Sequence, residues 1–141
     1  MTTRKSQATW ENGLKNGTGR ISFANGQFDQ PFSFSSRFEE GEGTNPEELI
    51  AAAHAGCFSM ALANELEKEG HAPKKVQTEA EVELDTANGE PAITVIVLTT
   101  KVEVAGIADD RFQEIAANAK ENCPVSRALA GAEIRLNAEM T

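Results

Sequence analysis

The sequence predicts an α+β protein, and three observations support this fold class. The first third contains short apolar stretches separated by turn residues, residues 45–69 have the pattern of a long helix, and residues 76–85 alternate between apolar and polar side chains. The predicted order is therefore strands, helix, hairpin, helix and strand. The 141 residues show no repeat and no linker, so we predict a single domain over residues 1–141 with one hydrophobic core.

The first predicted elements are strands over residues 20–24 and 31–38. Turn signals separate the apolar stretches of this region, namely Asn12-Gly13, Gly17-Thr18-Gly19 and Asn25-Gly26. In a strand over 31–38, alternation would place Phe32, Phe34 and Phe38 on one face. Arg37 would then point away from these phenylalanines.

The strongest helix prediction covers residues 45–69. Asn45 is a favourable N-cap, Pro46 suits the first helical position, Glu48 completes a capping-box pattern, and Gly70 ends the helix. Residues 51–55 contain four alanines and therefore form a thin face. We expect another element to pack closely against it.

A long hairpin is predicted next. Residues 76–85 form a strand with one solvated face, Asn88-Gly89 makes the turn, and residues 92–104 form a central strand that is apolar on both faces over 93–98.

The last third predicts a second helix, a short helical turn and a closing strand. Asp109 or Asp110 caps the helix, Pro124 interrupts it, and the turn extends through Ala130. A strand over 132–140 then places its alternate apolar residues inward.

Composition excludes several classes of partner. The hydrophobic fraction is 40%, the charged fraction is 25% and the formal net charge is −9, with the acidic residues spread along the chain. A negative field repels phosphate backbones and anionic lipids, so we expect neither nucleic acid nor membrane as a partner. No apolar run approaches the roughly 20 residues of a membrane span. The N-terminus lacks the apolar segment of a secretory signal, so we expect a cytoplasmic protein.

The two cysteines are the strongest candidates for chemistry. Cys57 lies in the middle of the long predicted helix, and Cys123 directly precedes Pro124. Two cysteines in a reducing compartment do not predict a structural disulfide, but a transient one remains open. Each could also be a small buried hydrophobic residue.

A reactive thiol needs a nearby positive charge, because an unperturbed thiol is only slightly ionised at neutral pH. On the helix itself, only His54 could help Cys57. Arg37, upstream of the helix, is the better candidate.

Two further alternatives concern metals and ligands. His54 and Cys57, with His71 or Cys123, could in principle bind zinc, but the spacings match no common site, so we expect neither metal nor cofactor. The phenylalanines are core candidates, and one or two of them could line an apolar groove beside Cys57.

Both cysteine motifs resemble those of a known family. The segment Gly43-Thr44-Asn45-Pro46-Glu47-Glu48-Leu49 continues through Ala51-Ala52-Ala53-His54-Ala55-Gly56-Cys57-Phe58-Ser59-Met60, and Cys123-Pro124-Val125-Ser126 follows near the end. Together they resemble the osmotically inducible protein C and organic hydroperoxide resistance (OsmC/Ohr) family over almost the whole chain. The position of Arg37 resembles the OsmC branch more than the Ohr branch.

This resemblance implies a fold and an activity. The fold would consist of antiparallel sheets packed on two main helices, in an intertwined homodimer with active sites at the subunit interface. The activity would be a thiol-dependent peroxidase that reduces organic hydroperoxides, and hydrogen peroxide more weakly. Residue by residue, Cys57 matches the peroxidatic cysteine, Cys123 the resolving cysteine, and Arg37 and Glu47 the charged pair that supports the thiolate. A dithiol, of the lipoyl or another type, would reset the disulfide.

Helix geometry adds a prediction about the dimer. Ten residues of helix separate Glu47 from Cys57, which is about 15 Å along the axis. We therefore predict that Arg37 and Glu47 reach Cys57 from the other subunit of a symmetric dimer. A helix broken at Ala55-Gly56, or one that starts after Glu47, would remove this argument.

Two other functions remain open. The same cysteine pair could serve a redox sensor or a module that binds an apolar ligand, although the sequence has no basic helix for reading DNA. A purely structural role predicts thiols with ordinary pKa values that resist alkylation.

Overall fold

A computed structural model describes residues 1–141. The chain divides into two compact units, Met1–Leu49 and Ile50–Thr141. Each unit has its own three-stranded sheet, and the fold contains four α-helices. The α+β prediction is therefore confirmed, whereas the single domain over 1–141 and the intertwined dimer stay predictions.

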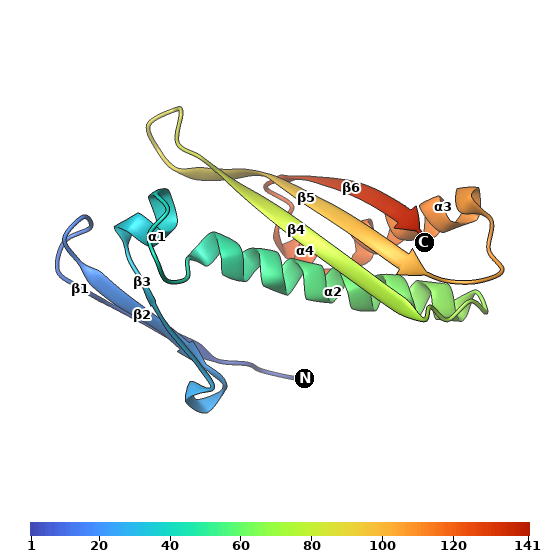
Figure 1. The fold of residues 1–141 in the computed structure, drawn as a ribbon, viewed down its shortest axis with the longest axis horizontal. Coiled ribbons are helices and arrows are strands. Elements are labelled where there is room, and N and C mark those ends of the chain that lie inside the picture. The colour runs from blue at the N-terminus through green and yellow to red at the C-terminus, as the bar shows by residue number, and fades with distance from the viewer. The chain divides into compact units, whose positions relative to one another are not determined.

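Unit 1 is an antiparallel sheet followed by one short helix (Figure 1). Its strands are β1 (Ser6–Glu11), β2 (Thr18–Phe23) and β3 (Phe28–Phe32), paired in the order β1-β2-β3, with a 3-10 turn η1 (Ala24–Gly26) before β3. Helix α1 (Phe34–Phe38) follows β3 directly.

Helix α1 contradicts the strand predicted over 31–38, which ends at Phe32. Ser33 and Ser36 form a reciprocal capping box, in which each hydroxyl accepts a hydrogen bond from the other's backbone N–H at 3.1 and 2.8 Å. This local hydrogen bonding favours a helix start over the alternating pattern. Arg37 consequently lies in the last turn of a helix, and the strand-based prediction of its direction is wrong.

Helix α2 (Pro46–Lys68) confirms the prediction over 45–69. The backbone N–H of Glu48 donates to Asn45 Oδ1 at 2.7 Å, which makes Asn45 the N-cap. At the other end Gly70 adopts φ +85°, and the N–H groups of Gly70 and His71 donate back to Glu67 and Leu66. The helix has no break at Ala55-Gly56.

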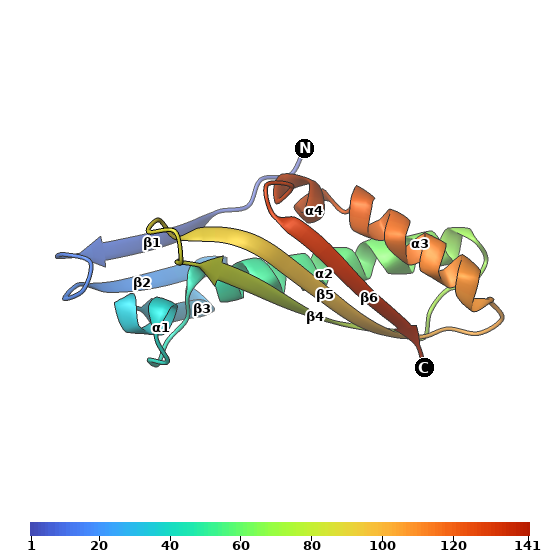
Figure 2. The same cartoon turned by 90° about the horizontal axis from the view of Figure 1, so that it is seen from above.

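Unit 2 contains most of α2, a mixed sheet and two further helices (Figures 1 and 2). The sheet has the order β4 (Lys75–Asp85), β5 (Ala92–Glu103) and β6 (Glu133–Met140). Helices α3 (Asp109–Asn122) and α4 (Pro124–Ala128) connect β5 to β6 and lie with α2 on one face of the sheet.

The sheet of unit 2 corrects one part of the fold prediction. The β4 and β5 strands pair antiparallel as a hairpin, but β5 and β6 pair parallel, so the prediction of antiparallel sheets is wrong for β6. The physical reason is the connection, because a strand that returns through helices on one face of the sheet re-enters in the same direction.

The core of unit 2 lies between this sheet and its helices. Its fully buried side chains include Phe58 and Leu62 from α2, Leu98 and Val102 from β5, and Phe112 from α3. The buried helix residues recur at helical spacing and the buried strand residues alternate, as the sequence pattern predicts.

Helix α2 is the one helix long and apolar enough to cross a membrane, with a mean hydropathy of 1.2. This corrects the expectation that no apolar segment approaches that length. Its residues Phe58, Leu62 and Leu66 are fully buried in the core of unit 2, whereas 22% of its most apolar 18-residue window is buried as a whole.

Truncation of Phe112 to alanine is expected to destabilise the protein by about 3–5 kcal/mol, because it removes a fully buried ring and leaves a cavity. Urea-induced unfolding would measure the change. The exposed Asn118 of the same helix is the control, and its replacement by alanine should change stability by no more than about 0.5 kcal/mol. Equal effects at the two positions would contradict the assigned core.

Candidate functional site: a cysteine pair beside an apolar cavity

The structure brings the two cysteines of unit 2 into contact. Cys57 Sγ on α2 lies 2.9 Å from Cys123 Sγ at the junction of α3 and α4, and both thiols are free. Cys123 is fully buried, whereas Cys57 is half-buried. A disulfide bond is about 2.05 Å long, so only a small movement separates this contact from a bond.

Helix packing explains why the sulfurs meet. The buried residues Ala116 and Ala119 give α3 a small-residue stripe in the core that also holds Phe58. Pro124 cannot continue α3, so the chain leaves helical geometry at Cys123 with φ −57° and ψ 125° and starts α4. The cysteine side chain is thereby fixed at the turn between two helices.

The surroundings of the two sulfurs shift their pKa values in opposite directions. Burial, followed by the hydrogen bond to Cys123, raises the pKa of Cys57 above the ordinary thiol value. Burial also acts to raise the pKa of Cys123, but hydrogen bonding with Cys57, with Ser126 and with backbone N–H groups outweighs it and lowers that pKa. Within unit 2, Cys123 is therefore the more acidic thiol, and Cys57 lacks a stabilising cation.

Arg37 and Glu47 form the second pair of predicted residues, within unit 1. Arg37 Nε donates to Glu47 Oε1 at 3.0 Å, and its Nη2 donates to Glu47 Oε2 at 3.1 Å. This is a bidentate pair, in which the side chain of Glu47 is only 10% exposed and that of Arg37 is 37% exposed. The guanidinium is therefore held in one orientation while its side chain remains partly exposed to solvent.

A hydrogen-bond network positions this ion pair. Ser36 Oγ donates to the carbonyl of Thr44 at 2.7 Å, and Asn45 Nδ2 donates to the carbonyl of Ser36 at 3.0 Å. These bonds fix α1 against the start of α2. Glu48 accepts from the hydroxyl of Thr44 at 3.1 Å, instead of closing the capping box predicted from the sequence.

An apolar cavity of about 760 Å³ opens beside Cys57. It lies between α2 and the junction of α3 and α4, and its lining is mainly uncharged. The lining residues are Cys57, Met60, Ala61, Asn64, Glu65, Ala119, Asn122 and Pro124. The predicted groove beside Cys57 thus exists, but none of the seven phenylalanines lines it.

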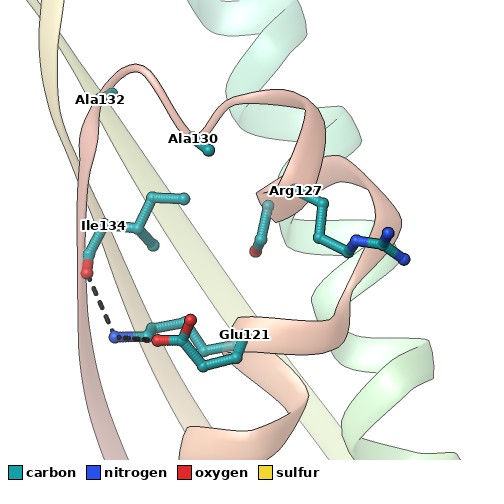
Figure 3. A pocket seen from close by; sticks show the side chains of 7 residues that line it. Glu121, Arg127, Ala130, Ala132 and Ile134 are labelled. Atoms are coloured by element: carbon teal, nitrogen blue, oxygen red, sulfur yellow. Dashed lines mark hydrogen bonds and ion pairs between the residues drawn. The ribbon is translucent and has the colours of Figure 1, made fainter.

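A second cavity of about 430 Å³ lies on another side of α4 (Figure 3). Glu121 of α3, Arg127 of α4 and Ile134 of β6 surround it, and Lys120 Nζ is paired with Glu121 at 3.3 Å. Neither cysteine lines this cavity. The apolar cavity beside Cys57 is therefore the candidate substrate site.

Sequence reasoning missed one buried polar contact of unit 2, which joins α2 to α4. His54 is fully buried, and its Nε2 lies 2.7 Å from Ser126 Oγ, a residue for which the sequence analysis assigned no role. The only signal was the position of Ser126 three residues after Cys123. No group of three or more histidine, cysteine or acidic side chains is arranged to hold a metal ion.

These features define a class of protein: a small α+β chain with two free cysteines in contact at the edge of an apolar cavity. That arrangement suits thiol–disulfide chemistry, since one sulfur is accessible and the other is buried directly behind it.

Comparisons with known proteins identify the family within this class. The family model for OsmC-like proteins matches residues 39–139. The chain is 46% identical to peroxiredoxin OsmC of Escherichia coli (strain K12) over 138 residues, which cover 97% of this chain and 96% of the relative. It is 34% identical to the organic hydroperoxide resistance protein OhrB of Bacillus subtilis (strain 168), over 80% of this chain and 82% of the relative. The chain belongs to the OsmC/Ohr family, which confirms the predicted resemblance.

A solved structure also resembles the fold. An organic hydroperoxide resistance protein from Elizabethkingia anophelis superimposes with a TM-score of 0.75 at 23% identity, over 99% of each chain.

Proposed function

We propose that this protein is a thiol-dependent peroxidase that reduces organic hydroperoxides, and hydrogen peroxide more weakly. The observation that carries the proposal is the 2.9 Å contact between the Cys57 and Cys123 sulfurs beside an apolar cavity. Membership of a family that includes a peroxiredoxin and organic hydroperoxide resistance proteins supports the same activity.

The exposure of the two thiols decides which of them reacts first with the hydroperoxide. A hydroperoxide in the apolar cavity can reach Cys57, which lines it, whereas Cys123 is fully buried behind Cys57. Cys57 is therefore the peroxidatic cysteine of the proposed reaction, and Cys123 is the resolving cysteine.

The reaction proceeds in three balanced steps. The Cys57 thiolate attacks one oxygen of the hydroperoxide, the O–O bond breaks, and the alkoxide takes a proton and leaves as the alcohol. Cys57 is thereby oxidised by two electrons to a sulfenic acid. Cys123 attacks that sulfur, the S–S bond forms, the S–O bond breaks, and water leaves. An external dithiol then reduces the disulfide by exchange and is itself oxidised.

A cation is required for the first step, because within unit 2 the pKa of Cys57 is raised by burial and by Cys123. Arg37 is the proposed cation. It is bound to Glu47, and α2 runs unbroken from Pro46 to Lys68, so about 15 Å of helix separates Glu47 from Cys57 of the same chain. Arg37 of the partner subunit is therefore proposed to serve Cys57 in a symmetric homodimer.

Replacement of Cys123 by serine is expected to separate the oxidation of Cys57 from the formation of the disulfide. The first equivalent of hydroperoxide is still consumed, because Cys57 remains, but turnover with a dithiol falls by about tenfold or more as the sulfenic acid accumulates. A stopped-flow assay with tert-butyl hydroperoxide and dithiothreitol would measure both phases. Full turnover in this variant would exclude Cys123 as the resolving cysteine, and a wild type that reduces only one equivalent would favour the redox-sensor alternative.

A further inference from the structure

The cavity beside Cys57 is lined by one charged side chain, which is that of Glu65. Met60, Ala61 and Glu65 follow Cys57 along α2 at spacings that place all four on one face of the helix. The helix rise puts Glu65 about 12 Å further along the axis than Cys57. The cavity therefore has the reactive sulfur near one end and a carboxylate near the other.

No positive side chain of unit 2 lines the cavity to balance this carboxylate. The wall that faces α2 consists of Ala119, Asn122 and Pro124, all of them uncharged. Lys68 Nζ donates to Glu65 Oε1 at 3.2 Å, but Lys68 does not line the cavity and its side chain is 64% exposed. An ion pair this exposed is weakened by water, so it offsets only part of the Glu65 charge. The field inside the cavity is therefore negative.

We propose that Glu65 is a specificity-determining residue, which makes the cavity select neutral organic hydroperoxides over those that carry a carboxylate. This inference rests on the proposed peroxidase function and narrows its substrate class. A hydroperoxide that places its O–O bond at Cys57 extends its organic group past Met60 and Ala61 toward Glu65. A carboxylate at the far end of that group meets a like charge whose side chain is only 39% exposed. Like charges a few ångström apart at such a site weaken binding by about tenfold.

The cation of the proposed reaction does not reverse this field. Arg37 is bound to Glu47 through two hydrogen bonds, so this pair has no net charge. Its proposed place is at Cys57, which is the other end of the cavity from Glu65. The formal net charge of the whole chain is −9, so the protein as a whole also disfavours the approach of an anionic substrate.

The direct test compares cumene hydroperoxide that carries a para carboxylate with the methyl ester of the same compound. The measured quantity is the ratio of kcat/KM for the ester to kcat/KM for the carboxylate, with dithiothreitol as the reductant. Any apolar cavity prefers the ester, because burial of a charge costs free energy. The contribution of Glu65 is therefore the change in this ratio on Glu65→Gln, which removes the charge and keeps the size of the side chain. We expect the ratio to fall about tenfold.

Two control variants test whether the position of the charge matters. Glu121→Gln removes the same charge from a side chain that lines the other cavity, so the ratio should stay at its wild-type value. Lys68→Gln removes the partner of Glu65 and should raise the ratio. The effect of Glu65→Gln should also shrink in about 1 M sodium chloride, because salt screens partly exposed charges. A purely steric effect of the substitution would persist at that salt concentration.

A binding measurement separates this proposal from the proposed function. Para-isopropylbenzoate and its methyl ester resemble the two hydroperoxides but lack the O–O bond, so they bind without reacting. Their Kd values come from the shift of the Asn122 amide resonance on titration into reduced protein, and the preference for the ester should again fall about tenfold in Glu65→Gln.

The outcomes of the two measurements are distinct. If the wild type reduces neither hydroperoxide while the binding preference falls as expected, the peroxidase is wrong and the role of Glu65 stands. A preference for the ester that does not fall in Glu65→Gln would overturn the proposal. So would an equal fall in Glu121→Gln, or a failure of both ligands to bind.

Discussion

Replacement of Cys57 by serine is expected to lower the rate of hydroperoxide reduction by about 10³-fold or more. The substitution changes one atom at a half-buried position, so packing in α2 is preserved. A serine hydroxyl is not ionised at neutral pH and does not displace oxygen from a peroxide, so the nucleophile is removed. The measurement is the loss of cumene hydroperoxide with time in the presence of dithiothreitol, corrected for the reaction without protein.

A matched control for this substitution is available on α3. Ala117 is exposed and does not line the cavity beside Cys57, so Ala117→Ser should reduce hydroperoxide at the wild-type rate. A Cys57→Ser variant that keeps a rate within a few-fold of the wild type would refute the assignment of Cys57 as the peroxidatic cysteine.

The second large effect is expected from Arg37→Met, which should lower kcat/KM for hydroperoxide by roughly 10²-fold at neutral pH. Without a cation, burial and Cys123 raise the pKa of Cys57, so less of the reactive thiolate is present. The form that reacts is the deprotonated one, so activity is lost below the raised pKa and regained as the pH rises through it. The midpoint of the pH–rate profile should therefore move upward.

The Arg111–Glu69 pair supplies the control for Arg37. Arg111 also makes two hydrogen bonds to one carboxylate, that of Glu69. Arg111→Met therefore removes a bidentate pair that is more exposed than Arg37–Glu47 and lies outside the proposed site. Its pH–rate profile should match that of the wild type. Arg37→Lys keeps the charge but loses the bidentate geometry and should lie between the wild type and Arg37→Met. If the midpoint of the pH–rate profile is unchanged in Arg37→Met, the proposed role of the guanidinium is wrong.

Helix α2 and much of unit 2 could be predicted from the sequence because their signals are local and consistent. Helix α2 has an N-cap at Asn45, a proline at its first position and a glycine stop at Gly70, and all three act where predicted. Strands β4 and β5 were predicted to within one residue at each end, since alternation and an Asn-Gly turn agree there.

The predictions were wrong where two local patterns compete, and where the path of the chain decides how strands pair. The alternation of phenylalanine and serine over 31–38 suggested a strand, but the Ser33 and Ser36 side chains cap a helix instead. Parallel pairing of β5 with β6 follows from the helical connection, which is a property of the chain path and not of either strand.

The two cysteines of the candidate site could be predicted from the sequence, whereas the residues that pack around them could not. Cysteine is rare and chemically distinctive, so Cys57 and Cys123 were apparent at once, and the structure places their sulfurs in contact. The contact between His54 and Ser126 joins residues 72 positions apart, and no local pattern indicates it. The charged pair Arg37–Glu47 was suggested by the family resemblance, and its hydrogen bonds lie within unit 1.

The most direct test of the central claim is the chemical state of both cysteines after one equivalent of an organic hydroperoxide has reacted with fully reduced protein. Mass spectrometry should find one disulfide per chain, joining Cys57 to Cys123 of the same chain, with one molecule of alcohol released for each disulfide. Two intact thiols with unconsumed hydroperoxide would contradict the account, as would a disulfide that joins two different chains.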